Sequence, residues 1–167
     1  VPSPPDEVKA QLNLGDWFYL GDSPGGGPDI AYNYNFNEYL TVWTGPDIDG
    51  SGWNHKVHAR LADSNGDTHE TTYDLGYRMQ NLPEIAYNPD DDTYLVGLGS
   101  GSTLDIQEVN WKGQPQDSAI RVYDDVGITA GLLEIVYNYG SDEYFVLFQD
   151  ATWNLRAQRV DHSGTLI

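Results

Sequence analysis

Two Trp-Asn dipeptides in polar stretches of the chain have the chemistry of a sugar-binding surface: Trp53-Asn54 and Trp153-Asn154. An exposed tryptophan ring offers a flat apolar face on which a sugar ring stacks, and a neighbouring amide can form hydrogen bonds with sugar hydroxyls. The two dipeptides therefore predict a carbohydrate-binding site. The alternative is that both rings fold inward and fill the space between layers of the fold.

Two short acidic stretches have the composition of calcium-binding loops. DIDGSG (47–52) places Asp47 and Asp49 two residues apart before a glycine, and DSNGD (63–67) places Asp63, Asn65 and Asp67 at alternating positions. Calcium binds several hard oxygen ligands around a bend that glycine permits. Both loops therefore predict a calcium site, although neither has the full spacing of an EF-hand. Ordinary solvated turns in an acidic chain are the alternative.

A threefold repeat supplies the elements that must position these residues. The copies begin with IAYNYNFNEYLTVW (30–43), IAYNPDDDTYLVGL (85–98) and IVYNYGSDEYFVLF (135–148), and each has a Tyr-Asn pair followed by a second Tyr. Asn, Asp, Gly and Pro between two strand-like runs are typical of a hairpin turn. Each copy therefore predicts two antiparallel strands joined by a short turn.

Two further strands follow in the repeat. The third segment aligns without gaps as VHARLADSNG (57–66), LDIQEVNWKG (104–113) and LRAQRVDHSG (155–164), and its Asp or Asn followed by Gly predicts a turn. A fourth strand is predicted from THETTYDL (68–75) and SAIRVYDDV (118–126), which are rich in β-branched and aromatic residues.

A four-stranded unit that repeats about every 50 residues is typical of a β-propeller blade. The second strand of each unit (39–43, 94–98 and 144–148) is apolar at nearly every residue, which predicts burial of both its faces. Segments 8–15 and 16–21 resemble a third and a fourth strand, which would complete the unit begun at the C-terminal end. We therefore expect about thirteen strands in about three blades, with two chains pairing to close a ring of about six blades.

The pattern AYN…EYLxVW…(I/L)xAQR(V/L)DxxG resembles the degenerate repeat of secreted bacterial and archaeal β-propellers. The resemblance covers the chain from about residue 8 onward, and the second copy departs from it with Gly97 in place of Val42 and Glu108 in place of Arg159. It implies an all-β fold of four-stranded antiparallel blades, in one domain over 1–167 with a Pro-rich tail at 1–7. It also implies a secreted or cell-surface location.

The composition argues against several classes of function. The 167 residues include 26 acidic and 8 basic ones, which gives a net charge of −18. Such a surface repels phosphate backbones and anionic membranes, so nucleic acid is not expected as a partner, and no apolar run approaches the length of a membrane span. Cysteine is absent, which excludes disulfides, thiol catalysis and Cys-based zinc sites.

These features favour a non-catalytic recognition or scaffold module that binds a glycan, with Ca²⁺ as the expected ion and a homodimer or a larger propeller as the expected assembly. Three equivalent carboxylates, Asp29, Glu84 and Glu134, begin the first strand of each unit and would face a central channel. A hydrolase that cleaves glycans with a pair of them is the alternative, because two carboxylates suffice for glycoside hydrolysis. A position that is acidic in all three units also suits a structural role, and a purely structural domain of a larger surface protein is a third interpretation.

Overall fold

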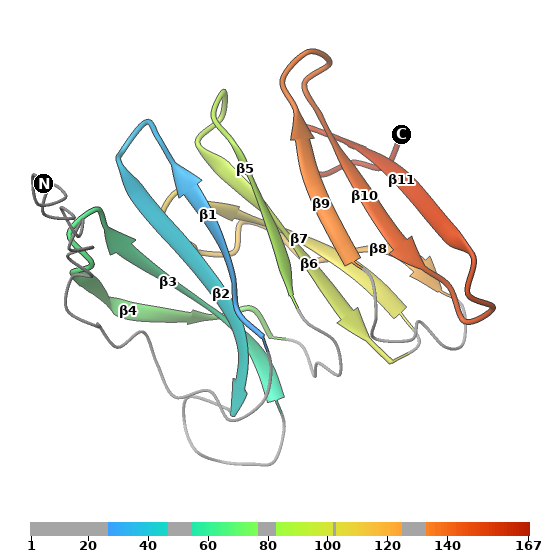
Figure 1. The fold of residues 1–167 in the computed structure, drawn as a ribbon, viewed down its shortest axis with the longest axis horizontal. Helices are drawn as coiled ribbons and strands as arrows, with labels where there is room; N and C mark the ends of the chain where they lie inside the picture. Colours follow the sequence, from blue (N-terminus) through green and yellow to red (C-terminus); the bar gives the residue numbers. More distant parts are fainter. Residues whose placement is uncertain (1–26, 47–54, 77–82, 102, 125–132) are drawn as a thin grey trace, which may run out of the picture.

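The computed structural model describes residues 27–46, 55–76, 83–101, 103–124 and 133–167. These ranges contain eleven strands in three antiparallel sheets and no helix, so the all-β prediction is confirmed (Figure 1). Within the same ranges there is accordingly no helix of the length and apolarity that crossing a membrane requires.

The strands of each sheet follow chain order. The first sheet contains β1 (Asp29–Asn33), β2 (Glu38–Pro46), β3 (His55–Asp63) and β4 (Thr68–Asp74). The second contains β5 (Glu84–Asn88), β6 (Thr93–Ser100), β7 (Thr103–Asn110) and β8 (Ile120–Asp124). The third contains β9 (Leu133–Asn138), β10 (Glu143–Gln149) and β11 (Leu155–Asp161). The sequence repeat therefore corresponds to one sheet per copy.

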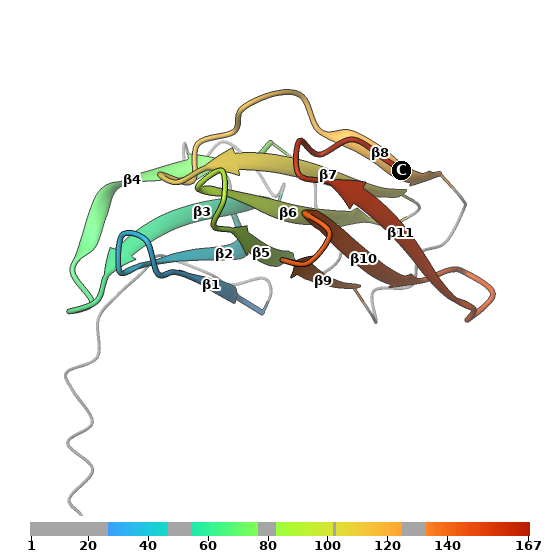
Figure 2. The same cartoon turned by 90° about the horizontal axis from the view of Figure 1, so that it is seen from above.

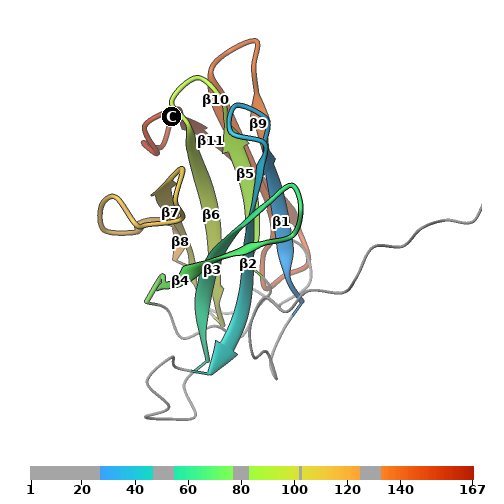
Figure 3. The same cartoon turned by 90° about the vertical axis from the view of Figure 1, so that its left-hand side faces the viewer.

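The three sheets lie side by side, with β1, β5 and β9 next to one another (Figures 1 and 2). Figure 2 places these three strands along one edge of the molecule and β4 and β8 along the opposite edge. Figure 3 looks at the first sheet from its outer side, with the other two sheets behind it. One end of β1, β5 and β9 therefore carries the three equivalent carboxylates close together.

The repeated Tyr and Asn residues build the hairpin turns. In the second sheet, Asn88 Oδ1 accepts a hydrogen bond from the Asp90 N–H (2.9 Å), and the Tyr87 hydroxyl donates to Asp92 Oδ1 (2.7 Å). Tyr87 and Tyr94 face each other across the two strands, with ring centroids 5.0 Å apart. The same contacts recur in the other two hairpins. The most conspicuous part of the repeat thus serves folding.

The apolar core lies between adjacent sheets, and β6 is its centre. All six residues between the ends of β6 are buried, because the first sheet covers one face and the third sheet covers the other. At Gly97 of β6 the second and third sheets approach each other closely: a Cβ there would lie 2.7 Å from Leu133 Cδ2 and 2.9 Å from Ile135 Cδ1. This close packing explains why the second copy has glycine where the first has Val42.

The structure corrects the prediction that every second strand is buried on both faces. It holds for β2 and β6, but β10 alternates, with Val146 buried and Phe145 41% exposed. Phe145 lies on the face of the third sheet that points away from the second sheet, together with Val136, which is 50% exposed. No other described sheet covers this face.

Some expectations fall outside the described residues. The strands expected at 8–15 and 16–21 are among them, so eleven of about thirteen strands are described. The three described sheets do not close into a ring. Beyond β11, Leu166 pairs with Val160 as Pro115 pairs with Val109, so the chain starts back along β11 toward the place of a fourth strand.

Candidate functional site

Four turns in the described residues share one hydrogen-bonding pattern over five residues. The side-chain oxygen of the first residue accepts the N–H groups of the third and fifth, and the N–H of the fourth donates to the carbonyl of the first. The first residues are Asp63, Asn110, Asp150 and Asp161. The fourth residue is at positive φ in every case, a conformation that glycine adopts without a steric penalty.

Trp153 occupies this fourth position in the turn between β10 and β11. The other three turns have Gly66, Gly113 and Gly164 there, at φ 87, 83 and 83, whereas Trp153 is held at φ 66. Its side chain is 70% exposed. A bulky residue with positive φ is a genuine outlier, and such strain concentrates at functional sites. Within the described residues the Trp153 ring is therefore largely open to solvent and is not folded into the core.

A buried carboxylate fixes the strained turn. Asp150, only 2% exposed, accepts hydrogen bonds from the backbone N–H of Thr152 (2.9 Å) and Asn154 (3.0 Å) and from the Thr152 hydroxyl (2.7 Å). Arg156 Nε donates to its other oxygen at 2.6 Å. The Thr152 hydroxyl, Arg156 and the two N–H groups hold the pKa of Asp150 well below its usual range. Asp150 therefore stays ionised and holds the turn that carries Trp153 in its observed conformation.

Only one of the two Trp-Asn dipeptides, Trp153-Asn154, lies in the described part of the chain. Trp53 and Asn54 lie outside the described residues. The amide Nδ2 of Asn154 donates to Thr152 Oγ1 at 2.5 Å and lies 3.4 Å from Asp150 Oδ2, so this group supports the turn. Trp153 is therefore the exposed residue of its dipeptide, and Asn154 supports the turn.

The acidic loops predicted for calcium are only partly described. Asp47 and Asp49 lie outside the described residues. Asp63 caps its turn: its carboxylate accepts the N–H groups of Asn65 (2.8 Å) and Asp67 (2.9 Å), and the Asn65 amide lies 3.3 Å from its second oxygen. These donors hold the pKa of Asp63 below its usual value. In the described part of the chain, no three acidic or histidine side chains are grouped to hold a metal ion.

The three equivalent carboxylates come together at the ends of β1, β5 and β9. Asp29 Oδ2 accepts a hydrogen bond from the N–H of Ile85, which belongs to the neighbouring sheet, at 2.8 Å. Desolvation, the charge of Asp29 and a hydrogen bond with it, and the charge of Glu134 raise the pKa of Glu84 to about 8. Asp29 thus joins two sheets, as a structural role requires, while Glu84 holds its proton at neutral pH.

The remaining tryptophans divide between core and turn. Trp43 of β2 is 5% exposed and belongs to the core, whereas Trp17 lies outside the described residues. Trp111 lies in the turn after β7 and stacks on Phe36 with ring centroids 5.0 Å apart.

Sequence reasoning missed the strain at Trp153. An available signal was the alignment of DATWN (150–154) with DSNGD (63–67), NWKGQ (110–114) and DHSGT (161–165). The tryptophan stands where the other three turns have glycine. A comparison of equivalent loops hides this signal, because DATWN joins β10 to β11, whereas the other three turns follow β3, β7 and β11.

No protein-family model matches this chain, and no curated protein does. Among solved structures it is similar to an N-acetylgalactosamine deacetylase from F. plautii, in complex with blood group B trisaccharide, with 12% identity and a TM-score of 0.55. That match covers 83% of this chain and 50% of the deacetylase chain. An exo-β-1,3-galactanase from Phanerochaete chrysosporium, with galactose, matches at 15% identity and a TM-score of 0.51, over 84% of this chain and 34% of the galactanase chain. The chain thus spans half or less of these proteins, and the likeness concerns the fold.

Proposed function

We propose that this chain is a non-catalytic, secreted carbohydrate-recognition module, built as part of a β-propeller. The observation that carries the proposal is the exposed side chain of Trp153 on a backbone with positive φ, where the three equivalent turns have glycine. Within the described residues the Trp153 ring is too exposed for packing to offset the strain, which favours a ligand that stacks on the ring. The similar solved structures lend support, because both were obtained with a sugar bound.

The propeller part of the proposal extends the three described sheets into a ring. The exposed face of the third sheet carries Val136, Phe145 and Leu155, which are 50%, 41% and 62% exposed. In a propeller a further blade covers such a face. We propose that a second copy of the chain supplies it, so that repeated glycan sites act together on a repetitive ligand.

A glycan array tests the recognition function. Wild-type protein is expected to bind a subset of glycans, and galactose-containing oligosaccharides are the first candidates, given the sugars in the two similar structures. Trp153→Ala and Trp53→Ala are expected to weaken this binding while the circular dichroism spectrum stays that of the folded chain. An array without any binding would contradict the proposal and favour a purely structural domain.

A glycan-cleaving hydrolase is the second candidate, and the raised pKa of Glu84 favours it, because a general acid must hold its proton at neutral pH. Release of reducing sugar from an array-positive glycan, abolished in Glu84→Gln or Glu134→Gln, would identify this function. Binding without release supports recognition.

A further inference from the structure

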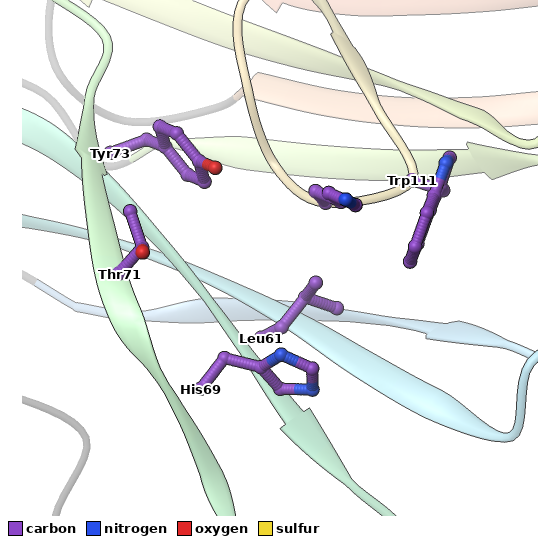
Figure 4. A pocket seen from close by; sticks show the side chains of 6 residues that line it. Leu61, His69, Thr71, Tyr73 and Trp111 are labelled. Atoms are coloured by element: carbon purple, nitrogen blue, oxygen red, sulfur yellow. The ribbon is translucent and has the colours of Figure 1, made fainter.

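A pocket lies between the first sheet and the turn that joins β7 to β8. Its volume is about 330 Å³, and its lining consists of Leu61, His69, Thr71, Tyr73, Trp111 and Lys112. Figure 4 shows Tyr73, Thr71 and His69 along β4 on one side, Trp111 on the opposite side and Leu61 between them. The three β4 residues are two apart in sequence, so they point to the same face of the strand. The volume lies at the lower end of the range for small-molecule sites, about 300–1,000 Å³.

The aromatic wall of the pocket is held in place by tight packing. Gly113 follows Trp111 and Lys112 at φ 83, and a Cβ there would lie 2.8 Å from Leu40 Cδ1 in the first sheet. Trp111 stacks on Phe36 from the first hairpin, with an angle of 23° between the rings. Because both sheets contribute to these contacts, the orientation of Trp111 is fixed before any ligand arrives.

The charge of the pocket lining is opposite to that of the chain. The chain has 26 acidic and 8 basic residues, yet none of the described residues that line the pocket is a carboxylate. Lys112 has no carboxylate partner in the described part of the chain, and its ammonium lies 4.7 Å from the centroid of the Trp111 ring. His69 also lines the pocket, with Nε2 3.5 Å from Glu38 Oε1. An ammonium group forms a strong, charge-assisted hydrogen bond with an anionic ligand.

The next sheet interface provides an internal comparison. There the turn after β11 packs over β7 and β8 as the turn after β7 packs over β3 and β4, but the space enclosed is only about 40 Å³. In the gapless alignment, His162 and Ser163 occupy the places of Trp111 and Lys112. His162 is engaged with Asp91 at 2.8 Å. Equivalent positions thus leave little space between the second and third sheets, whereas between the first and second sheets they line a larger pocket with an aromatic ring and an ammonium group.

We infer that this pocket binds a sugar that carries a carboxylate, such as a uronic acid residue of an acidic glycan. The sugar ring packs against Trp111 and Tyr73, Lys112 pairs with the carboxylate, and Thr71 and His69 form hydrogen bonds with hydroxyls. The site uses none of the residues of the turn between β10 and β11. Binding of an acidic sugar in the pocket can therefore be tested independently of sugar binding at Trp153.

The test is calorimetric titration with a tetramer of galacturonate and with the same tetramer after reduction of its carboxyl groups to alcohols. Salt of about 0.15 M screens the overall repulsion between the acidic chain and ligand beyond about 8 Å, while the contact with Lys112 persists. The acidic tetramer is expected to bind at least about tenfold more tightly than the reduced one, a difference of about 1.4 kcal/mol. Equal binding, or no binding of either tetramer, would overturn the inference.

Variants assign the binding to the pocket. Lys112→Gln is expected to remove the preference for the acidic tetramer, and Lys56→Gln is the matched control, since it removes the same charge from a lysine that pairs with Asp74 outside the pocket. Trp111→Ala is expected to weaken both tetramers, and melting curves establish that each variant is folded. An equal loss in Lys56→Gln and Lys112→Gln would also overturn the inference, because it would show a general charge effect.

Discussion

Trp153 and Gly164 occupy the same position of two turns that have the same hydrogen-bonding pattern, at φ 66 and φ 83. In both turns an aspartate side chain accepts the N–H groups of the third and fifth residues. Glycine is the residue that this backbone favours, and a residue with a Cβ costs about 1 kcal/mol there.

The first prediction follows from this comparison. Trp153→Gly is expected to unfold at a higher denaturant concentration than Trp153→Ala, by about 1 kcal/mol in free energy of unfolding, because glycine adopts positive φ without strain. Urea unfolding followed by circular dichroism measures the difference. Equal stabilities of the two variants would show that the turn does not strain residue 153.

Glu84 gives a prediction for pH. Below about pH 4.5 the folded and unfolded chains both hold the proton on Glu84, so its contribution does not change. Between about 4.5 and 8 the unfolded chain has released this proton and the folded chain retains it, so stability falls as pH rises. Solvent screening of this half-buried group reduces the effect to about 1 kcal/mol, or about 2–4 °C in melting temperature.

Glu84→Gln is the test of that assignment, because an amide stays neutral and can still donate a hydrogen bond to Asp29. The variant is expected to melt about 2–4 °C above wild type at pH 8 and with wild type at pH 4. Glu38→Gln serves as the control on another strand. A gap between Glu84→Gln and wild type that is the same at both pH values would contradict the proton assignment.

The architecture could be read from the sequence because one pattern occurs three times. The hairpins follow from Tyr87 and Tyr94 and their equivalents, whose spacing sets the turn and the cross-strand pair. The equivalence of Asp29, Glu84 and Glu134 also followed from the repeat. The raised pKa of Glu84 did not, since it depends on burial and on charges brought from two other sheets.

Features that arise between sheets could not be read from the sequence. Gly97 was visible only as a departure from the repeat, and its reason is the close approach of Leu133 and Ile135. The pocket beside Trp111 likewise combines β3 and β4 with a turn about 40 residues later. The carboxylate of Asp63 accepts backbone N–H groups of its own turn. The acidic composition of this turn indicated a calcium site instead.

Calcium binding stays a prediction of the acidic loops. If Asp47 and Asp49 bind Ca²⁺ together with Asp63 and Asp67, millimolar calcium raises the melting temperature, because a ligand that binds only the folded state stabilises it. A chelator reverses the rise, and Asp49→Asn abolishes it. An unchanged melting curve with calcium and with chelator removes calcium from the account.

Assembly is tested through the exposed face of the third sheet. Light scattering is expected to give twice the mass of one chain, and Phe145→Glu is expected to give a monomer, since a charge on this face opposes burial. Tyr139→Glu is the control, because Tyr139 lies in a hairpin turn and is 64% exposed. A wild-type monomer at all concentrations would contradict the two-chain ring.

Titration of the tightest-binding array glycan into wild type and Trp153→Gly tests the central claim most directly. The account predicts that Trp153→Gly binds at least about tenfold more weakly, a loss of about 1.4 kcal/mol, while its free energy of unfolding is equal to or greater than that of wild type. Loss of binding without loss of stability separates a ligand-facing ring from a structural one. Unchanged affinity in Trp153→Gly would contradict the claim that Trp153 is the sugar-binding surface.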